Sequence, residues 1–193
     1  MTNETIESAE PAVEKNRYRV FWREYDQQVL SEWWQSLDDN RGERAKLRRC
    51  GQPEEVLLQP AFHSLYQRLP KSNALALAAV AGLVAQVKSP NTLAFPAQLG
   101  KSKEGSDKPV LSELRFQQLL ASRDLDEFYE SLRRAILLLG REANILSIAD
   151  GVLHWTKEQH DKNQYTERPD QRFQFSWAKA YFGEVFKYTE NKK

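Results

Sequence analysis

The sequence predicts an all-α protein, a compact bundle of about eight helices that forms either one body or two packed helical lobes. Three observations support this fold class. Apolar residues recur at spacings of three and four along most of the chain, no segment alternates between apolar and polar residues, and glycine, proline and asparagine interrupt the pattern. With 193 residues, of which 40% are hydrophobic and 28% charged, the chain is long enough for a substantial core.

The N-terminal part divides into a tail and a first helix. Residues 1–15 are acidic, polar and without periodicity, which predicts a disordered tail in front of an all-helical domain over 16–190. From about Tyr18 to Leu37 the apolar residues fall four apart, as in an amphipathic helix. The turn-forming run 38–42 ends this helix, and a short basic helix is expected over 42–50.

The middle of the chain carries several helix-start signals. Pro53 and Pro60 each predict a helix start, because proline fits the first turn. Asn73 is expected to cap a helix over 74–88, which is apolar nearly all round and is therefore predicted to be enclosed by other helices. Residues 89–110 contain three prolines and two glycines and show no sustained period, which predicts a long surface loop.

The second half is predicted to be helical again. Asn144 is a cap candidate, and Gly140 is expected to end the helix before it. Leu137 and Leu138 lie off the apolar stripe of that helix, so either another helix or a partner protein is expected to cover them. The predicted helices span 112–122, 124–139, 144 to beyond 155, and 172–188.

Catalytic chemistry is not apparent in the sequence. His154 and His160 are six residues apart and do not share a helix face, and Asp38–Asp39 are read as turn formers. The single cysteine, Cys50, excludes an internal disulfide or a zinc finger and fits a reducing compartment. No phosphate-loop or dinucleotide motif occurs, and the N-terminus does not resemble a signal peptide. We therefore expect a cytoplasmic, non-enzymatic protein without cofactor, metal or membrane contact.

Positive charge is concentrated locally, although the net charge is only +1. Arg41, Arg44 and Arg48 fall on one face of the predicted basic helix, and Lys46 and Arg49 form an adjacent row. Guanidinium groups grip phosphates in a bidentate manner, so this pattern indicates contact with a nucleic-acid backbone. A solvated charged helix face is the alternative.

A second group of arginines lies in the C-terminal half. On the 124–139 helix, Arg134 projects opposite the apolar stripe and Arg133 lies at its flank. Acidic neighbours such as Glu130 offer ion-pair partners, which weakens the case for nucleic acid there. The members of this group are Arg115, Arg123, Arg133, Arg134 and Arg141.

Two blocks of short motifs occur in sequence order between about residues 30 and 185. The first has W-x-x-L, L-R-R, an acidic Pro-flanked turn and P-A-F; the second has S-E-x-R-F, Q-x-L-x-x-x-R, L-R-R and H-W. The first block consists of Trp34 with Leu37, Leu47–Arg49, Pro53–Glu55 and Pro60–Phe62. The second consists of Ser112, Glu113, Arg115 and Phe116, then Gln117, Leu119 and Arg123, then Leu132–Arg134, and His154 with Trp155.

Together these blocks resemble the CasB-type small subunit of the type I-E CRISPR surveillance complex, Cascade. The resemblance implies an all-α, non-catalytic subunit of an antiviral ribonucleoprotein that carries CRISPR RNA (crRNA). It implies three kinds of protein partner: a second copy of the chain, the backbone subunits and the large subunit. It also implies contact with target DNA, including the displaced strand, which is held open as an R-loop. The residues carried over are Arg48, Arg49, Arg115, Arg123, Arg133 and Arg134; helix geometry adds Arg44 and Lys46.

Two other classes of protein stay open at this stage. A purely structural adaptor would tie up its arginines in internal ion pairs and would not bind nucleic acid. A helix-turn-helix regulator would use residues 44–49 on a recognition helix and would bind specific, spaced half-sites as a dimer.

Overall fold

The computed structural model describes residues 20, 23–70, 72–103, 106–160 and 168–190, which form ten α-helices, a 3-10 turn and two very short strands. The all-α prediction is confirmed; there are ten helices rather than about eight. The helices are α1 (Glu24–Asp39), α2 (Arg41–Arg49), α3 (Pro53–Leu57), α4 (Pro60–Arg68), α5 (Ala74–Val84), α6 (Phe95–Gly100), α7 (Glu113–Leu120), α8 (Leu125–Leu138), α9 (Ile145–His160) and α10 (Phe173–Glu190); the other elements are β1 (Ser89–Pro90), β2 (Glu142–Ala143) and η1 (Pro169–Gln171).

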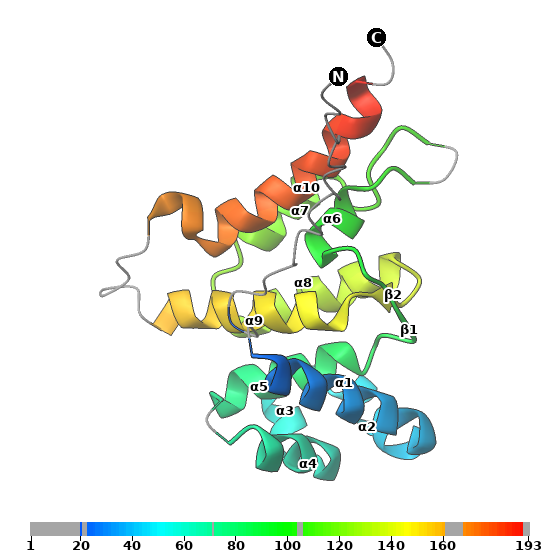
Figure 1. The fold of residues 1–193 in the computed structure, drawn as a ribbon, viewed down its shortest axis with the longest axis vertical. Helices are drawn as coiled ribbons and strands as arrows, with labels where there is room; N and C mark the ends of the chain where they lie inside the picture. The colour runs from blue at the N-terminus through cyan, green and yellow to red at the C-terminus, as the bar shows by residue number, and fades with distance from the viewer. Residues whose placement is uncertain (1–19, 21–22, 71, 104–105, 161–167, 191–193) are drawn as a thin grey trace, which may run out of the picture.

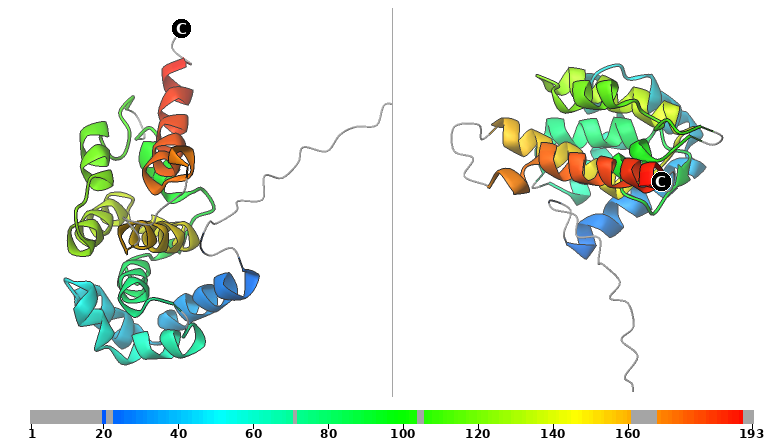
Figure 2. Two further views of the ribbon diagram at one scale, coloured as in Figure 1. Left: turned by 90° about the vertical axis from the view of Figure 1, so that its left-hand side faces the viewer. Right: turned by 90° about the horizontal axis from the view of Figure 1, so that it is seen from above.

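The helices pack around α5. This helix lies between the first four helices and the α8–α9 pair, and α6, α7 and α10 cover the other side of that pair (Figures 1 and 2). Residues 76–84 of α5 are all buried, as its all-round apolar sequence predicted. Buried apolar side chains from Val29 in α1 to Tyr181 in α10 form a single cluster. The buried core of the described residues is therefore continuous from α1 to α10.

The local helix signals in the sequence are confirmed. The side chain of Asn73 accepts a hydrogen bond from the backbone N–H of Ala76 at 3.0 Å, and Asp124 caps α8 in the same way. Pro53 and Pro60 open α3 and α4. Each of these signals acts over three or four residues, so it does not depend on the rest of the fold.

The prediction of a surface loop over 89–110 is wrong for residues 95–100, while the described residues 101–103 and 106–108 are exposed and non-helical. The segment contains α6, whose six residues are all buried against α10. The two helices meet closely because Gly100 has no side chain: a Cβ atom there would lie 2.2 Å from the carbonyl oxygen of Tyr181. The first helix also begins later than predicted, at Glu24, and the predicted tail over 1–15 lies outside the described residues.

Two tryptophans of α1 fasten this helix to its neighbours. The indole N–H of Trp33 donates to the carbonyl oxygen of Ala61 in α4 at 2.9 Å, and that of Trp34 donates to Val84 in α5 at 3.0 Å. Both indoles are buried, and each polar atom has a partner, as burial requires.

Candidate nucleic-acid interface

The C-terminal ends of α2 and α5 and the turn after α8 meet at one junction. The β1–β2 pairing, at the right-hand edge of Figure 1, holds the segment after α5 beside the segment after α8. Ser89 pairs with Glu142 and Pro90 with Ala143 in a parallel arrangement. Three arginines from separate parts of the sequence lie at this junction: Arg48, Arg133 and Arg141, which we call the basic cluster.

Arg48 and Arg133 are anchored by backbone carbonyl groups. The Nε of Arg48 donates to the carbonyl oxygen of Ala85, at the end of α5, at 2.7 Å. Arg133 of α8 donates to the carbonyl oxygens of Arg48 at 2.8 Å and Cys50 at 3.3 Å. These carbonyls lie at helix C-termini, where the helix dipole favours a cation. Both arginines are half-buried and are held in defined positions.

Arg141 joins the cluster from the turn that follows α8. Its Nη1 donates to the backbone oxygen of Gln86 at 3.3 Å and to the Gln86 side-chain oxygen at 3.1 Å. The Gln86 amide donates in turn to the carbonyl oxygen of Arg48 at 3.1 Å. Arg141 has a φ of +68°, the one positive value at a non-glycine residue in the described chain. This left-handed conformation costs roughly 1–2 kcal/mol, so the turn is held by its contacts.

The positive charge of the cluster is not neutralised by a neighbouring acid. Every hydrogen-bond acceptor of the three guanidinium groups is an uncharged oxygen, and no carboxylate of the described residues forms an ion pair with them. Burial lowers the pKa of Arg48, and the charges of Arg44 and Arg141 lower this pKa further, while Asp38 acts in the opposite direction. Anions are therefore attracted to this junction.

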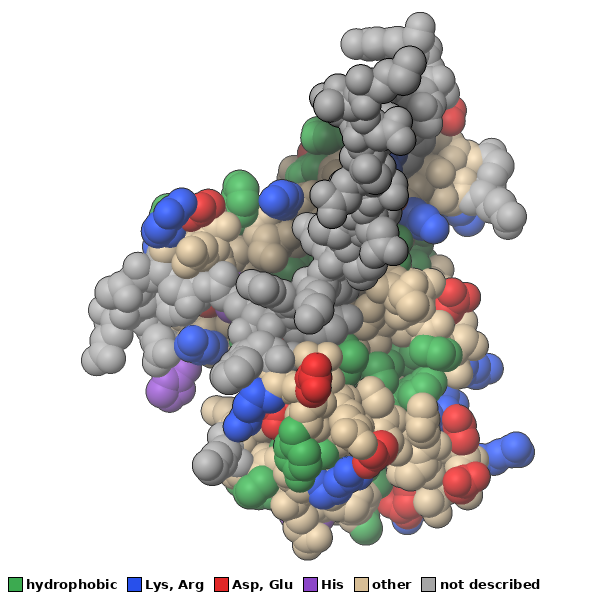
Figure 3. Space-filling view, in the orientation of Figure 1, with side chains coloured by type: hydrophobic (Ala, Val, Ile, Leu, Met, Phe, Trp, Pro, Cys, Tyr) green, Lys and Arg blue, Asp and Glu red, His purple; other side chains and the backbone are tan. Residues whose placement is uncertain are grey.

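Several guanidinium nitrogens of the cluster remain available. The two Nη atoms of Arg48 and the Nε and Nη2 atoms of Arg141 have no described protein acceptor, and none of them is among the buried unsatisfied atoms, so they reach solvent. Arg49 and Lys88 are exposed in the neighbouring segments. By contrast, acidic and basic side chains are interspersed over the face of the molecule in Figure 3. The cluster is a local feature, in agreement with the low net charge.

Arg44 occupies a different environment from the rest of the predicted set. Its side chain is buried and donates to Asp38 at 2.7 Å and to the carbonyl oxygen of Trp34 at 2.9 Å. The guanidinium carbon lies 5.3 Å from the centre of the Trp34 ring, within cation–π range. Arg44 thus fastens α2 to α1, and its burial does not favour the predicted contact with nucleic acid.

Three further predicted residues are exposed but paired with acidic residues three or four positions away in the sequence. Lys46 contacts Glu43 at 2.6 Å, Arg123 contacts Glu127 at 3.6 Å, and Arg134 contacts Glu130. Arg115 on α7 is exposed, without a described ion-pair partner. The structure therefore brings together Arg48 and Arg133, with Arg49 nearby. Arg115 and Arg134 lie at a separate place, where both line one groove.

Arg141 is the component that sequence reasoning left out of the predicted set. The signal was present, because Arg141 directly follows Gly140, the residue predicted to end the helix. Gly140 has a φ of +65° and ends α8 as expected. A cation just after such a stop is near the negative helix end. The sequence does not indicate that the segment just after α5 lies against Arg141, because this contact depends on the tertiary fold.

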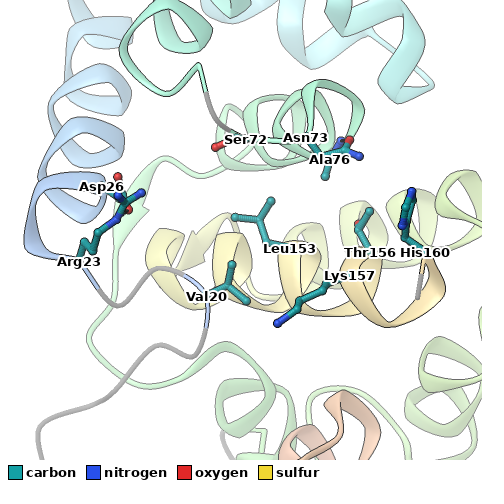
Figure 4. A pocket seen from close by; sticks show the side chains of 10 residues that line it. All are labelled: Val20, Arg23, Asp26, Ser72, Asn73, Ala76, Leu153, Thr156, Lys157 and His160. Atoms are coloured by element: carbon teal, nitrogen blue, oxygen red, sulfur yellow. Dashed lines mark hydrogen bonds and ion pairs between the residues drawn. The ribbon is translucent and has the colours of Figure 1, made fainter. Parts of the chain in front are cut away.

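A pocket of another type lies between α1, α5 and α9 and has a volume of about 420 Å³. Figure 4 shows Arg23 and Asp26 at one end of it and His160 at the other. Arg23 donates to Asp26 at 2.6 Å. Asp26 and His160 are therefore not arranged as an acid–base pair.

The described residues hold neither a candidate metal site nor a candidate membrane span. No three histidine, cysteine or acidic side chains there are grouped so that they could hold a metal ion. Among the helices of the same residues, none has both the length and the apolar character that crossing a membrane requires.

The fold is that of an all-α protein in which a basic cluster lies at a junction of helix ends. The family model of the CRISPR-associated protein Cse2 matches residues 43–182, which is more than half of the chain. The chain belongs to the Cse2 family, the small subunits of type I-E Cascade, and the resemblance seen in the motifs is confirmed. Cse2 proteins are structural subunits that are not known as enzymes. No curated protein and no solved structure gives a significant match.

Proposed function

We propose that this Cascade subunit binds a nucleic-acid backbone through the basic cluster and so helps to hold the opened target DNA, the R-loop. The observation that supports the proposal is the anchoring of three guanidinium groups by neutral carbonyl oxygens. Their positions are fixed before a ligand arrives, while their charges and several N–H donors remain available. Preorganised donors of this kind lose little entropy when they bind phosphate.

The chemistry of the cluster favours the backbone over the bases. A phosphate oxygen accepts charge-assisted hydrogen bonds from arginine irrespective of sequence. In RNA-guided recognition, base pairing with the guide RNA supplies sequence specificity, so a subunit that holds a strand needs contacts of this sequence-independent type. Membership of the Cse2 family supports the complex that carries crRNA as the setting. The displaced strand and a second copy of the chain belong to the same proposal.

The test is the salt dependence of target-DNA dissociation from the reconstituted complex. Target DNA should dissociate faster from a complex that carries the double variant Arg48→Gln/Arg141→Gln. The variant should also lower the steepness of the plot of log K, the binding constant for target DNA, against log salt concentration by about 1.4–1.8, because two phosphate contacts are lost and each contributes about 0.7–0.9. The change should be the same for different target sequences. An unchanged slope together with an unchanged dissociation rate would contradict the proposal.

Two controls separate the cluster from general charge and from misfolding. Lys46→Gln/Arg123→Gln removes the same amount of charge at ion-paired positions and should leave the slope nearly unchanged. An equal effect of this control would indicate that the predicted residues outside the cluster also contact the nucleic-acid backbone. Arg49→Gln, at an exposed position, tests the flank of the cluster without removing an anchor of the helix ends. Melting curves of each variant establish that it is folded.

The structural adaptor is the second candidate, because each arginine of the cluster also fastens a helix end. It predicts lower melting temperatures for the cluster variants with no change in salt slope. The regulator is disfavoured by the packing of α2: Arg44 is buried, and the end of the helix is covered by Arg133. A recognition helix needs one face free to enter a groove.

A further inference from the structure

A groove runs between α7 and the C-terminal half of α8. These helices lie together at one edge of the molecule (Figure 2), and the groove has a volume of about 500 Å³. Its apolar lining includes Leu111 and Leu119 from the α7 side and Leu137 and Leu138 from α8. It differs from the basic cluster in chemistry, since aliphatic side chains predominate.

The two α8 leucines of this groove are more exposed than apolar residues of a helix usually are, whereas Leu111 and Leu119 are buried. Leu137 is 44% exposed and Leu138 is 48% exposed, although α8 already buries Leu132 and Ile136 in the core. Leu114, which is also on α7, is 67% exposed. The sequence indicated that a helix or a partner covers Leu137 and Leu138, and no described helix of this chain does so. A contiguous exposed apolar surface of this kind marks an interaction site.

The charged residues that line the groove are all positive. Arg115 is exposed at the α7 side and has no described ion-pair partner. Arg134 stands at the α8 side, where it contacts Glu130, which does not line the groove. An occupant with apolar residues in its centre and carboxylates at its flanks would match this pattern.

We propose that the α7–α8 groove docks an amphipathic helix of another protein subunit, with an apolar ridge flanked by carboxylates. Two neighbouring helices with an apolar groove between them match the helix-in-groove mode of recognition. Nucleic acid fits the groove poorly, because none of the lining residues is aromatic and bases could not stack there. The role of the groove is independent of the proposed strand holding by the basic cluster.

The geometry of α8 allows both surfaces to be occupied together. Arg133 and Arg134 are consecutive and therefore project about 100° apart around the helix axis. Arg133 faces the end of α2, and Arg134 lines the groove. A strand held at the cluster and a helix in the groove would approach α8 from different sides.

The experiment measures incorporation of the subunit into the complex assembled on crRNA. Leu137→Ser/Leu138→Ser should reduce incorporation at least about tenfold at a fixed subunit concentration, as loss of a central apolar contact does. Arg115→Glu should reduce it as well, and this effect should weaken at high salt. The matched control is Leu58→Ser, because Leu58 is 80% exposed on a different part of the molecule. It should assemble normally.

A second measurement identifies the occupant. A photoreactive amino acid at position 138 in the assembled complex should cross-link to a helix of another protein subunit. Cross-linking to nucleic acid, or only to a second copy of this chain, would overturn the assignment, as would normal incorporation of a correctly folded Leu137→Ser/Leu138→Ser variant. DNA dissociation is read separately, so failure of this inference is distinguishable from failure of strand holding.

Discussion

Arg44 and Arg48 lie one helical turn apart on α2, and their environments differ in one respect that matters for binding. Arg44 has a carboxylate partner, Asp38, and is buried against Trp34. Burial lowers its pKa, and the nearby Asp38 partly offsets that effect. Arg48 has only carbonyl acceptors and keeps part of its guanidinium group in solvent. One arginine is therefore neutralised within the protein, and the other is not.

Replacing Arg44 tests this structural role. Arg44→Ala removes the bonds to Asp38 and to the buried Trp34 carbonyl and should lower the free energy of unfolding by about 2–3 kcal/mol, the usual range for buried charge-assisted bonds. Lys46→Ala, in an exposed pair on the same helix, should change it by less than about 0.5 kcal/mol. Urea denaturation of the two variants measures the difference. Equal losses would show that Arg44 is not a structural anchor.

Helical periodicity alone places Arg44 and Arg48 on the same face and cannot tell them apart. The difference comes from their partners, which lie elsewhere in the sequence: Trp34 is ten residues before Arg44, and Ala85 is 37 residues after Arg48. Arg133 is anchored by a carbonyl 85 residues away. Contacts over such separations depend on the tertiary fold, so the sequence indicated the residue types at the site and not their arrangement.

At the scale of single elements, α6 shows where local signals fail. The helix has six residues, includes Pro96 and ends at Gly100, a composition that is typical of a loop. Its position is determined by α10, which packs closely over it. The caps at Asn73 and Asp124, by contrast, were predictable because the acceptor and the donor are only three residues apart.

Two glycine substitutions test the α6–α10 contact. Gly100→Ala would place a methyl group against the backbone of Tyr181, which cannot move without shifting α10, and should destabilise the protein by about 3 kcal/mol. Gly183→Ala, on α10 with open space around its Cβ position, should instead stabilise it by about 0.5–1 kcal/mol. Thermal unfolding distinguishes the two, and a mild effect of Gly100→Ala would mean that the helices are less closely packed.

On the scale of the whole molecule, one core supports two surfaces of different chemistry. The buried cluster runs from α1 to α10, and α8 contributes to it as well as to both surfaces. The match to the Cse2 family covers residues 43–182 and therefore includes the basic cluster and the α7–α8 groove. The proposed strand holding and the proposed docking of a helix therefore use separate surfaces of one subunit.

The single cysteine offers a probe of the whole molecule. Cys50 is buried next to the cluster, and burial, with a contribution from Glu55, raises the pKa of its thiol. Both effects slow alkylation, since the thiolate is the reactive form. We expect labelling of the folded protein at neutral pH to be at least about a hundredfold slower than that of the denatured chain. Fast labelling under native conditions would show that the end of α2 opens readily.

The anchoring of the three arginines has a thermodynamic consequence. The groups proposed to hold phosphate also fasten α2, α5 and the turn after α8. The binding of a strand at the junction and the stability of the junction against opening are therefore thermodynamically linked. A strand bound only to the intact junction would raise its resistance to opening by an amount that grows with the logarithm of strand concentration. Conversely, a substitution that loosens the junction far from any phosphate would weaken strand holding. In such a subunit, rigidity is itself a determinant of affinity.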